Sequence, residues 1–287
     1  MDKPSISISI IGLGKVGTAL LRVLSENGYR ILSTIDRGSV SKDLRSEYSE
    51  VTLLDSIPDS KEDLGNLILI TVPDDAIAEI VNDLDKKFKS LNHISIAHCS
   101  GTHSSATLGK LRSKGAKIAS FHPIRSITGS TKDFKDTWFD VEGDLALIKV
   151  FERIAEDLDA NLIEIEASQK PYLHTSAVIA SNYLVVLANL MTKVSVGGDI
   201  PEEVSLKAMI PLMRNTLDNI EQNGVSDSLT GPIARGDVNT VKDHLKLLSS
   251  HPDLFRSYKL LGLEALKMST LESSKGPAYD KLMELLS

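Results

Sequence analysis

The chain has few of the features that mark secreted, nucleic-acid-binding or membrane proteins. Its 287 residues include a single cysteine, Cys99, which cannot form a disulfide within the chain. The first residues, MDKPSIS, lack the charged-then-apolar layout of a secretion signal. A net charge of −7 without clustered Lys and Arg argues against a surface for nucleic acid or anionic membrane. We therefore expect a cytoplasmic protein that acts on small molecules.

One long segment lacks charge altogether. No charged residue occurs between Lys170 and Lys193, a span long enough to cross a bilayer. The span contains five polar side chains that would be costly in lipid: His174, Ser176, Ser181, Asn182 and Asn189. A helix that is apolar on most sides is buried in protein, either by its own domain or by a partner subunit. We expect such a buried helix, with no membrane contact, and a homodimer follows as a hypothesis.

The glycines near the start have the pattern of a dinucleotide-binding loop. The run Gly12-Leu13-Gly14-Lys15-Val16-Gly17 follows an apolar stretch and precedes a helix-like one, which is the context that this motif requires. In such a loop Gly12 makes the tight turn, Gly14 lets the backbone approach a pyrophosphate, and Gly17 lets the helix pack close to the strand. The N–H groups at the helix N-terminus then bind the phosphates.

The remaining pattern predicts two domains. Up to about residue 166, short apolar runs alternate with helix-like stretches, which predicts an α/β fold with a doubly wound, mostly parallel sheet of Rossmann type. The expected strands are residues 6–11, 30–35, 51–54, 67–72, 93–97, 117–121, 139–141 and 162–165. From residue 167 to 287 the strand signals vanish, and we expect a smaller all-helical domain for substrate binding or dimerisation, with a loop at residues 229–236.

The residues after the second strand bear on the choice of cofactor. An acidic side chain there binds the ribose 2′-hydroxyl of NAD, whereas an arginine accommodates the 2′-phosphate of NADP. The chain offers both, as Asp36 and Arg37, and Arg37 with Ser39 would make a phosphate pocket. We expect NADP, with NAD as the alternative. Ligands of open sheets bind at the carboxyl ends of the strands, so Val72, Pro73 and Asp74 are further expected cofactor contacts.

Polar residues at two other places are candidates for catalysis. Lys170 and His174 are spaced i, i+4 and share one helix face, with Asn182 two turns further on. Such a lysine can donate a proton to an oxygen as hydride arrives, while a neutral histidine holds substrate or shares the proton. His122 and Ser100 follow two sheet strands, where a cleft is expected. The alternative for each is a structural hydrogen bond.

We expect no metal site. His98, Cys99 and His103 lie close together in the sequence, but their spacing fits no common zinc pattern.

In several stretches the chain resembles a bacterial family of proposed NADP-dependent oxidoreductases that join a Rossmann-like domain to a domain of unknown function, DUF2520. The matching stretches are IGLGKVGTAL, VPDDAI, HCSG, SFHPIRS, YLHTSAVIASNYLVVL and LTGPIARGD. The last two are specific to that family. The glycine motif alone is not.

More distantly, the chain is similar to the 6-phosphogluconate dehydrogenase C-terminal-like superfamily, with ketopantoate reductase, pyrroline-5-carboxylate reductase and prephenate dehydrogenase. Members with a catalytic lysine carry an asparagine four residues later; here Lys170 matches the lysine and His174 replaces the asparagine. Prephenate dehydrogenases carry a catalytic histidine before a proline, which His122 resembles, with Ser100 near their substrate-binding serine. The resemblance thus implies two alternative acid/base residues, His122 and Lys170. We expect His174 and Asn182 to orient substrate, and Arg235, in a glycine-rich loop, to bind a substrate anion.

The sequence therefore predicts an enzyme, an NADP-dependent oxidoreductase that transfers a hydride between nicotinamide and a small polar carbonyl, imine or alcohol, with a carboxylate on the substrate. Its active site is expected in the cleft between the domains. The alternatives are a ketopantoate-type 2-oxo acid reductase and a non-catalytic NADP-binding sensor.

Overall fold

The computed structural model describes residues 6–38 and 46–287, so that Ser39, an expected cofactor ligand, lies outside the described residues. The chain forms two compact units, residues 1–181 and 182–287.

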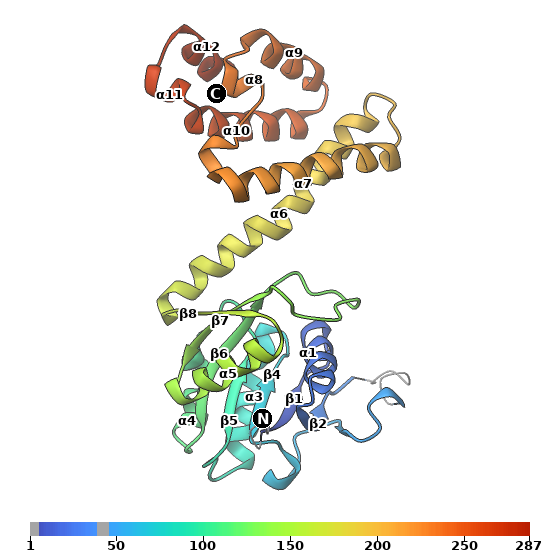
Figure 1. Cartoon of the computed structure of the whole chain (residues 1–287), viewed down its shortest axis with the longest axis vertical. Helices are drawn as coiled ribbons and strands as arrows, with labels where there is room; N and C mark the ends of the chain where they lie inside the picture. The colour runs from blue at the N-terminus through green and yellow to red at the C-terminus, as the bar shows by residue number, and fades with distance from the viewer. Residues whose placement is uncertain (1–5, 39–45) are drawn as a thin grey trace. The chain divides into compact units, whose positions relative to one another are not determined.

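The first unit is built on an eight-stranded sheet with the strand order β3-β2-β1-β4-β5-β6-β7-β8 (Figure 1). The strands are β1 (Ser7–Ile11), β2 (Arg30–Ile35), β3 (Thr52–Leu54), β4 (Leu67–Ile70), β5 (Ser95–His98), β6 (Lys117–Ile124), β7 (Trp138–Gly143) and β8 (Asn161–Glu164). Neighbouring strands are parallel except for β6 and β7. The predicted doubly wound, mostly parallel sheet is confirmed.

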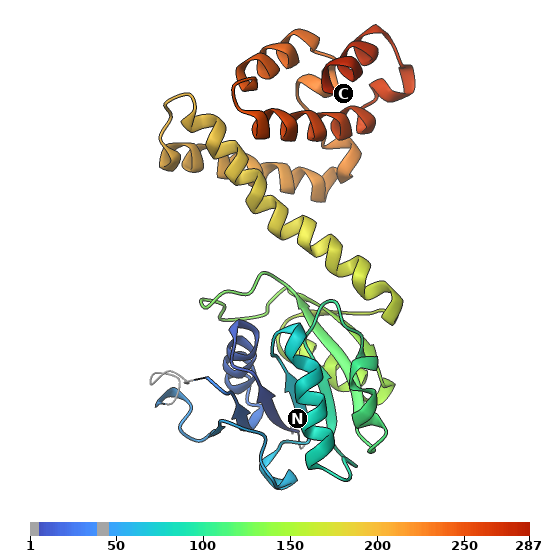
Figure 2. The same ribbon diagram turned by 180° about the vertical axis from the view of Figure 1, so that it is seen from behind.

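Helices cover both faces of this sheet, as the two opposite views show (Figure 2). On one face α1 (Lys15–Glu26) and α5 (Leu145–Asp157) bury leucines and the stacked rings of Phe121, Phe139 and Phe151. On the other, α3 (Asp74–Lys87) and the short α4 (Gly109–Arg112) pack on a second apolar cluster. Strands buried on both faces are expected to be almost wholly apolar, and β4 (Leu-Ile-Leu-Ile) is fully buried.

The antiparallel pair β6 and β7 brings two polar residues together. In its register His122 lies directly opposite Asp140. Directly opposed residues project from the same face of a sheet with adjacent side chains. A shift of one residue would send Asp140 to the opposite face.

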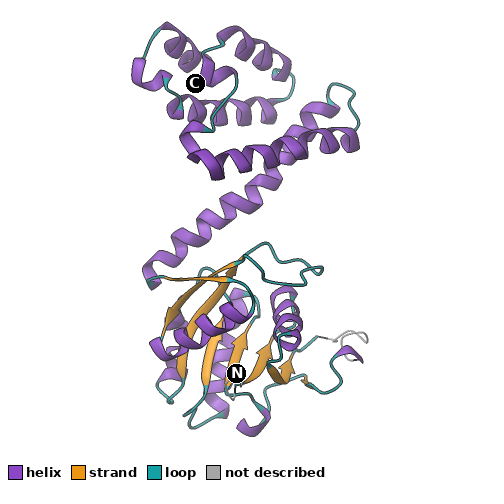
Figure 3. Ribbon diagram, viewed as in Figure 1, coloured by secondary structure: helices purple, strands orange, loops and turns teal. Residues whose placement is uncertain are grey.

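The second unit consists of helices joined by loops and turns, with no strand among its described residues (Figure 3). It contains most of α6 (Lys170–Val196), followed by α7 (Glu202–Asp227), α8 (Pro232–Arg235), α9 (Val238–Leu248), α10 (Pro252–Met268), α11 (Leu271–Ser274) and α12 (Pro277–Leu286). A small core holds Val241, Leu245, Leu266 and Leu282. The expectation of a loop at residues 229–236 is wrong in part. Pro232 in the first turn and Gly236 in a left-handed conformation (φ 77°) give α8 the ends that a short helix needs.

The uncharged helix forms as expected, and its apolar side chains are exposed among the described residues. Among the described residues, the helical segment 167–196 is by length and composition apolar enough to cross a membrane, and only 6% of its most apolar window is buried. Large apolar side chains along it are exposed: Tyr172, Ile179, Tyr183, Val185, Val186, Leu187, Val194 and Val196. Of the two expected alternatives, this exposure leaves burial by a partner subunit as the remaining prediction. The residues of α6 are apolar on nearly every side, so no single stripe directs it onto one neighbour.

Candidate functional site

The loop between β1 and α1 holds Gly12 in a conformation that favours glycine. Its φ is 102°, and a Cβ there would lie 2.8 Å from Cγ1 of Val72. The Gly12 N–H donates to the Ile35 carbonyl oxygen at 2.8 Å, and Thr71 Oγ1 donates to the Gly12 carbonyl oxygen at 2.5 Å. The turn is therefore fixed from β2 on one side and from the end of β4 on the other.

The other two glycines of the motif differ in what surrounds them. A Cβ on Gly17 would collide with the Gly12 carbonyl oxygen and would lie 2.6 Å from Thr71 Oγ1, so α1 packs against the turn only because residue 17 is glycine. A Cβ on Gly14 would meet nothing within 4 Å. Gly14 therefore faces open space at the N-terminus of α1, where the first N–H groups of a helix have no carbonyl partner within the helix.

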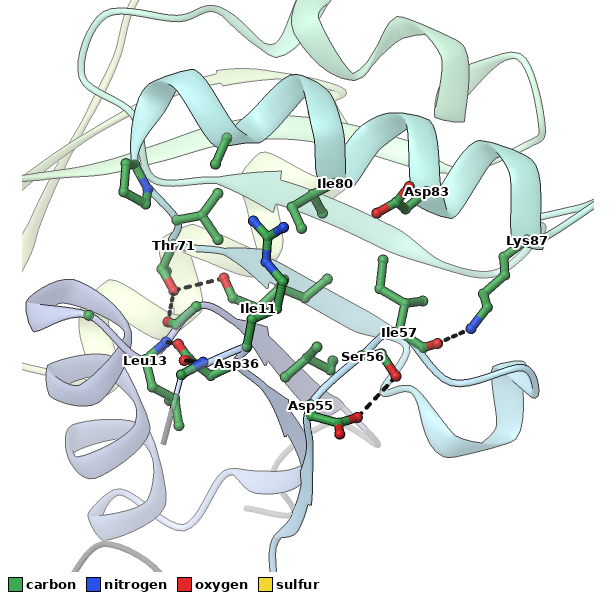
Figure 4. Close-up of a pocket in the computed structure, with 18 of the residues that line it drawn as sticks. Ile11, Leu13, Asp36, Asp55, Ser56, Ile57, Thr71, Ile80, Asp83 and Lys87 are labelled. Atoms are coloured by element: carbon green, nitrogen blue, oxygen red, sulfur yellow. Dashed lines mark hydrogen bonds between the residues drawn. The ribbon is translucent and has the colours of Figure 1, made fainter. Parts of the chain in front are cut away.

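A cavity of about 670 Å³ lies beside this loop (Figure 4). The ends of β1, β2 and β4 form its floor, and one face of α3 forms a wall. Its lining residues are Ile11, Gly12, Leu13, Gly14, Ile35, Asp36, Arg37, Gly38, Asp55, Ser56, Ile57, Thr71, Val72, Pro73, Ala76, Ile80, Asp83, Lys86 and Lys87. The volume lies within the range of small-molecule and cofactor sites.

Asp36 and Arg37 occupy different positions at the cavity. The Asp36 carboxylate accepts the Leu13 N–H at 2.5 Å and the Gly38 N–H at 2.7 Å, so both of its oxygens bind the loops that carry it. The Arg37 guanidinium lies at the rim, where it donates to both carboxylate oxygens of Glu79 at 2.7 and 3.2 Å. Arg37 and Glu79 are both exposed.

Most of the cofactor contacts expected from the sequence line this cavity, but not all of them do. Lys15, Val16 and Gly17 lie further along α1, and Asp74 lies outside the described lining. Sequence reasoning missed Ser56 and the wall of α3. The spacing of Ile80, Asp83 and Lys87 places them on one face of that helix, and this periodicity was the available signal.

A second group of polar residues gathers around the pair of β6 and β7. Asp140 accepts from both sides: His122 Nδ1 lies 2.6 Å from its Oδ2, and Lys170 Nζ donates to its Oδ1 at 2.6 Å. The side chains of Lys170 and Asp140 are 0% and 3% exposed, whereas that of His122 is 15% exposed. Of the three, only the histidine ring reaches the surface to any extent.

The opposite edge of the His122 ring faces Gly101 and His174. The two histidine rings meet edge-on, with centroids 5.9 Å apart. A Cβ on Gly101 would collide with His174 Nδ1 and would lie 2.8 Å from His122 Nε2. His174 Nδ1 is buried and has no hydrogen-bond partner among the described residues. Both nitrogens thus lie against one small residue, close enough together for a single ligand oxygen to reach both.

The loop after β5 connects this group to the first cavity. The buried Ser100 hydroxyl accepts the N–H groups of Thr102 and His103 at 3.2 and 3.0 Å. Thr102 Oγ1 in turn donates to Asp74 at 2.7 Å. Burial alone would raise the pKa of Asp74, but hydrogen bonds from Thr102 and Ser100 outweigh it and lower the pKa.

The neighbours of Ser100 are poor candidates for chemistry. Burial lowers the pKa of His98, whose Nε2 lies 3.0 Å from the Ser104 carbonyl oxygen and whose Nδ1 lies 3.3 Å from the Ser100 N–H. Burial also raises the pKa of the Cys99 thiol to about 12, although the residue keeps some exposed surface. A thiol with so high a pKa is a weak nucleophile.

Two expected substrate residues belong to the second unit. Asn182 is exposed on α6. Arg235 ends α8, binds Asp237 through Nε at 3.0 Å and Nη2 at 2.8 Å, and lines a cavity of about 420 Å³ within that unit.

Comparison with solved structures shows the same fold along nearly the whole chain. A proposed NADP oxidoreductase of Bacteroides fragilis is 21% identical, with a TM-score of 0.75 over 92% of this chain and 98% of that one. Protein TM1727 of Thermotoga maritima is 26% identical, with a TM-score of 0.69 over 94% and 100%. Pyrroline carboxylate reductase of Plasmodium falciparum, solved with NADP bound, is 13% identical, with a TM-score of 0.60 over 98% and 100%.

Two protein families account for most of the sequence. Residues 1–123 match a Rossmann-like domain, and residues 137–265 match the domain of unknown function DUF2520. No curated protein matches the chain. The chain therefore joins a Rossmann-like domain to a DUF2520 domain.

Proposed function

We propose that the protein is an NADP-dependent oxidoreductase that transfers a hydride between nicotinamide and a small polar carbonyl, imine or alcohol. The observation that carries this proposal is the glycine loop beside the 670 Å³ cavity, with Gly12 and Gly17 locked in place and Gly14 facing open space. Each glycine has the surroundings that its task in binding a pyrophosphate requires. The B. fragilis and P. falciparum proteins of the same fold are described as NADP proteins, which supports the choice of cofactor.

We assign substrate chemistry to the second group of residues, with His122, Lys170, His174 and Ser100 as its catalytic and orienting side chains. Asn182, which belongs to the second unit, is proposed separately as a further orienting residue. The hydrogen bond from Thr102 to Asp74 supports a common site, because it joins the loop beneath the histidines to the helix that walls the cavity. We assign Arg235 to a carboxylate on the substrate. In this proposal residues 1–166 bind the dinucleotide, residues 167–287 bind substrate and dimerise, and the protein acts in the cytoplasm.

Calorimetry with NADPH and NADH tests the cofactor, and Gly14→Ala is the informative variant. Its new methyl group meets no atom of the protein, so the variant should melt as the wild type does. The methyl group would fill the space through which a pyrophosphate approaches, and we expect affinity for NADPH to fall at least tenfold. Wild-type protein that binds neither nucleotide, or a Gly14→Ala variant that binds as tightly as wild type, contradicts the proposal.

Measurements of turnover distinguish the proposed oxidoreductase from the two alternatives, a ketopantoate-type reductase and a non-catalytic sensor. NADPH oxidation measured with a panel of small oxo acids and imines identifies a reductase, and preference for a 2-oxo acid would favour the ketopantoate-type alternative. We expect activity to fall at least tenfold in His122→Ala while NADPH affinity holds. Tight NADPH binding without turnover of any substrate would favour a sensor instead.

We also propose that the protein is a homodimer. The helix α6 is nearly uncharged, and its apolar side chains stay exposed in the single chain. A second copy of the chain would cover them. Exposed apolar surface of this extent marks an interaction site.

A further inference from the structure

We propose that Asp140, which the sequence analysis did not single out, is a positioning residue that fixes the tautomer of His122. In this arrangement His122 Nε2 is the atom that exchanges a proton with substrate, and Lys170 balances the charge of Asp140 instead of donating a proton. This inference rests on the proposed function. It chooses His122 over Lys170 as the acid/base residue.

Asp140 determines which nitrogen of the His122 ring carries the hydrogen. An ionised carboxylate can only accept hydrogen bonds. His122 Nδ1, 2.6 Å from Asp140 Oδ2, must therefore carry the hydrogen of this contact. In a neutral imidazole the other nitrogen, Nε2, is then the acceptor. That nitrogen faces Gly101 and the unpartnered Nδ1 of His174, away from Asp140.

Lys170 balances the charge of Asp140. A carboxylate with only 3% of its side chain exposed requires a partner charge, and the fully buried Lys170 supplies it through Oδ1 at 2.6 Å. The two oxygens of Asp140 are thus divided, one to the ammonium and one to the imidazole. Because the lysine already balances the charge, the histidine does not have to remain protonated to satisfy the aspartate.

His122 and Lys170 differ in how far a substrate can reach them. Lys170 is 0% exposed and its ammonium is bound to Asp140, so no substrate atom reaches it without breaking that ion pair. His122 is 15% exposed, and its free nitrogen lies beside His174. A substrate oxygen or nitrogen held between the two rings would contact His122 Nε2 directly. A general acid or base must be within hydrogen-bond reach of the proton that it moves.

The register of the sheet makes this arrangement specific. His122 and Asp140 are directly opposed on β6 and β7, and Lys170 begins α6. Asp140 is the charged residue between Phe139 and Val141, which are both buried in the aromatic core of the unit. A carboxylate in such a strand is costly unless it is paired, and here both of its partners are in the candidate site.

Nitrogen NMR of the full-length protein with ¹⁵N-labelled histidine tests the tautomer without any substrate. In wild type we expect His122 Nδ1 to carry the hydrogen. The signals of His122 are identified as those that disappear in the variant His122→Gln. In Asp140→Asn the amide oxygen should turn to the Lys170 ammonium and the NH₂ group to His122. The ring should then switch to the tautomer with hydrogen on Nε2. A wild-type ring protonated at Nε2, or an unchanged ring in Asp140→Asn, would overturn the positioning role.

Kinetics with whichever substrate the oxidoreductase turns over test the role of Lys170. Asp140→Asn should lower kcat at least tenfold while NADPH affinity holds, because acid/base catalysis typically contributes about 10²–10⁴-fold. Adding Lys170→Met to Asp140→Asn should cost no further activity, since the charge that Lys170 balances is already gone. The exposed Lys193, at the other end of α6, provides the control variant Lys193→Met.

A further tenfold loss in the double variant would make Lys170 the proton donor and refute the inference. The double variant leaves no unbalanced buried charge. Its activity can therefore be compared with that of Asp140→Asn even if Lys170→Met alone fails to fold. If no substrate is turned over, the NMR result still decides the tautomer. Failure of the proposed function and failure of this inference are therefore distinguishable.

Discussion

Arg37 is the residue on which coenzyme choice depends in this proposal. Asp36 is already bound to the backbone of two loops, whereas the partner of Arg37 among the described residues is the exposed carboxylate of Glu79. Exposed ion pairs contribute little to stability because water and salt screen them. A phosphate dianion at the cavity rim would compete well with such a partner, since a guanidinium binds phosphate bidentately.

Replacing Arg37 with Ala should weaken NADPH binding at least tenfold and leave NADH binding nearly unchanged, because only NADPH carries the 2′-phosphate. Glu79→Gln should act in the opposite direction and tighten NADPH binding by releasing the guanidinium. Calorimetric titration of both nucleotides measures these effects. Equal losses for the two nucleotides in Arg37→Ala would show that Arg37 does not select the phosphate.

Single residues differ in how far the sequence revealed them. The tasks of Gly12, Gly14 and Gly17 follow from the motif, and their surroundings in the structure agree with those tasks. Asp140 was missed, although it lies inside an expected strand at residues 139–141, because its partner depends on the register between two strands, which their sequences do not give. A charged residue between two buried aromatic and aliphatic neighbours was the signal that could have found it.

The helix α6 is the element with the largest unexplained apolar surface. Val185 in its middle is 69% exposed in the single chain. In water such exposure costs roughly 25 cal/mol per Å² of apolar surface that a partner could cover. Several such side chains along one helix therefore favour association of two copies.

Val185→Glu should disrupt the proposed dimer, because a carboxylate placed in an apolar interface loses its hydration without gaining a partner. Leu247→Glu is the matched control, since Leu247 on α9 is similarly exposed at 66%. Light scattering at micromolar concentration should give a dimer for wild type and control and a smaller species for Val185→Glu. A wild-type chain that is strictly monomeric, or that requires detergent, contradicts the dimer.

At the level of elements, periodicity predicted all eight strands of the sheet within a few residues. It did not give the direction of β7, because a strand has the same alternating pattern in either direction. The connection from β6 to β7 contains no helix among its described residues, which is what an antiparallel neighbour permits. The short α8 was missed because one turn of helix has too few residues to show a period.

Stability of the whole molecule should depend on pH through His98. Its side chain is buried, and burial lowers its pKa in the folded state. In the unfolded chain the pKa of His98 is near 6.5, whereas in the folded chain it is lower. Below that pH the unfolded state therefore binds more protons, and the free energy of unfolding should fall as pH falls, by at most about 1.4 kcal/mol per pH unit for this one group.

Urea denaturation between pH 7 and pH 5 measures this effect, above the range in which carboxylates titrate. His98→Gln should flatten the dependence, because an amide can accept the Ser100 N–H and donate to the Ser104 carbonyl without titrating. The exposed His251 provides the control His251→Gln, which should keep the wild-type slope. A slope unchanged in His98→Gln would assign the dependence to other groups.

The organisation of the whole chain was partly accessible from the sequence. The change from alternating to helical pattern lies at residue 167, whereas the compact units divide after Ser181, inside α6. A continuous helix carries one periodicity along its length, and that periodicity does not reveal where its contacts pass from one unit to the other.

The opposition of His122 and Asp140 has a consequence for how this protein can be recombined with others. The histidine lies in the part that matches the Rossmann-like domain, and the aspartate and Lys170 lie in the part that matches DUF2520. The border between the two matches therefore runs through one sheet. A chimera with its breakpoint between residues 123 and 137 inherits half of the histidine–aspartate couple from each parent, so both parents must supply matching residues at these two positions.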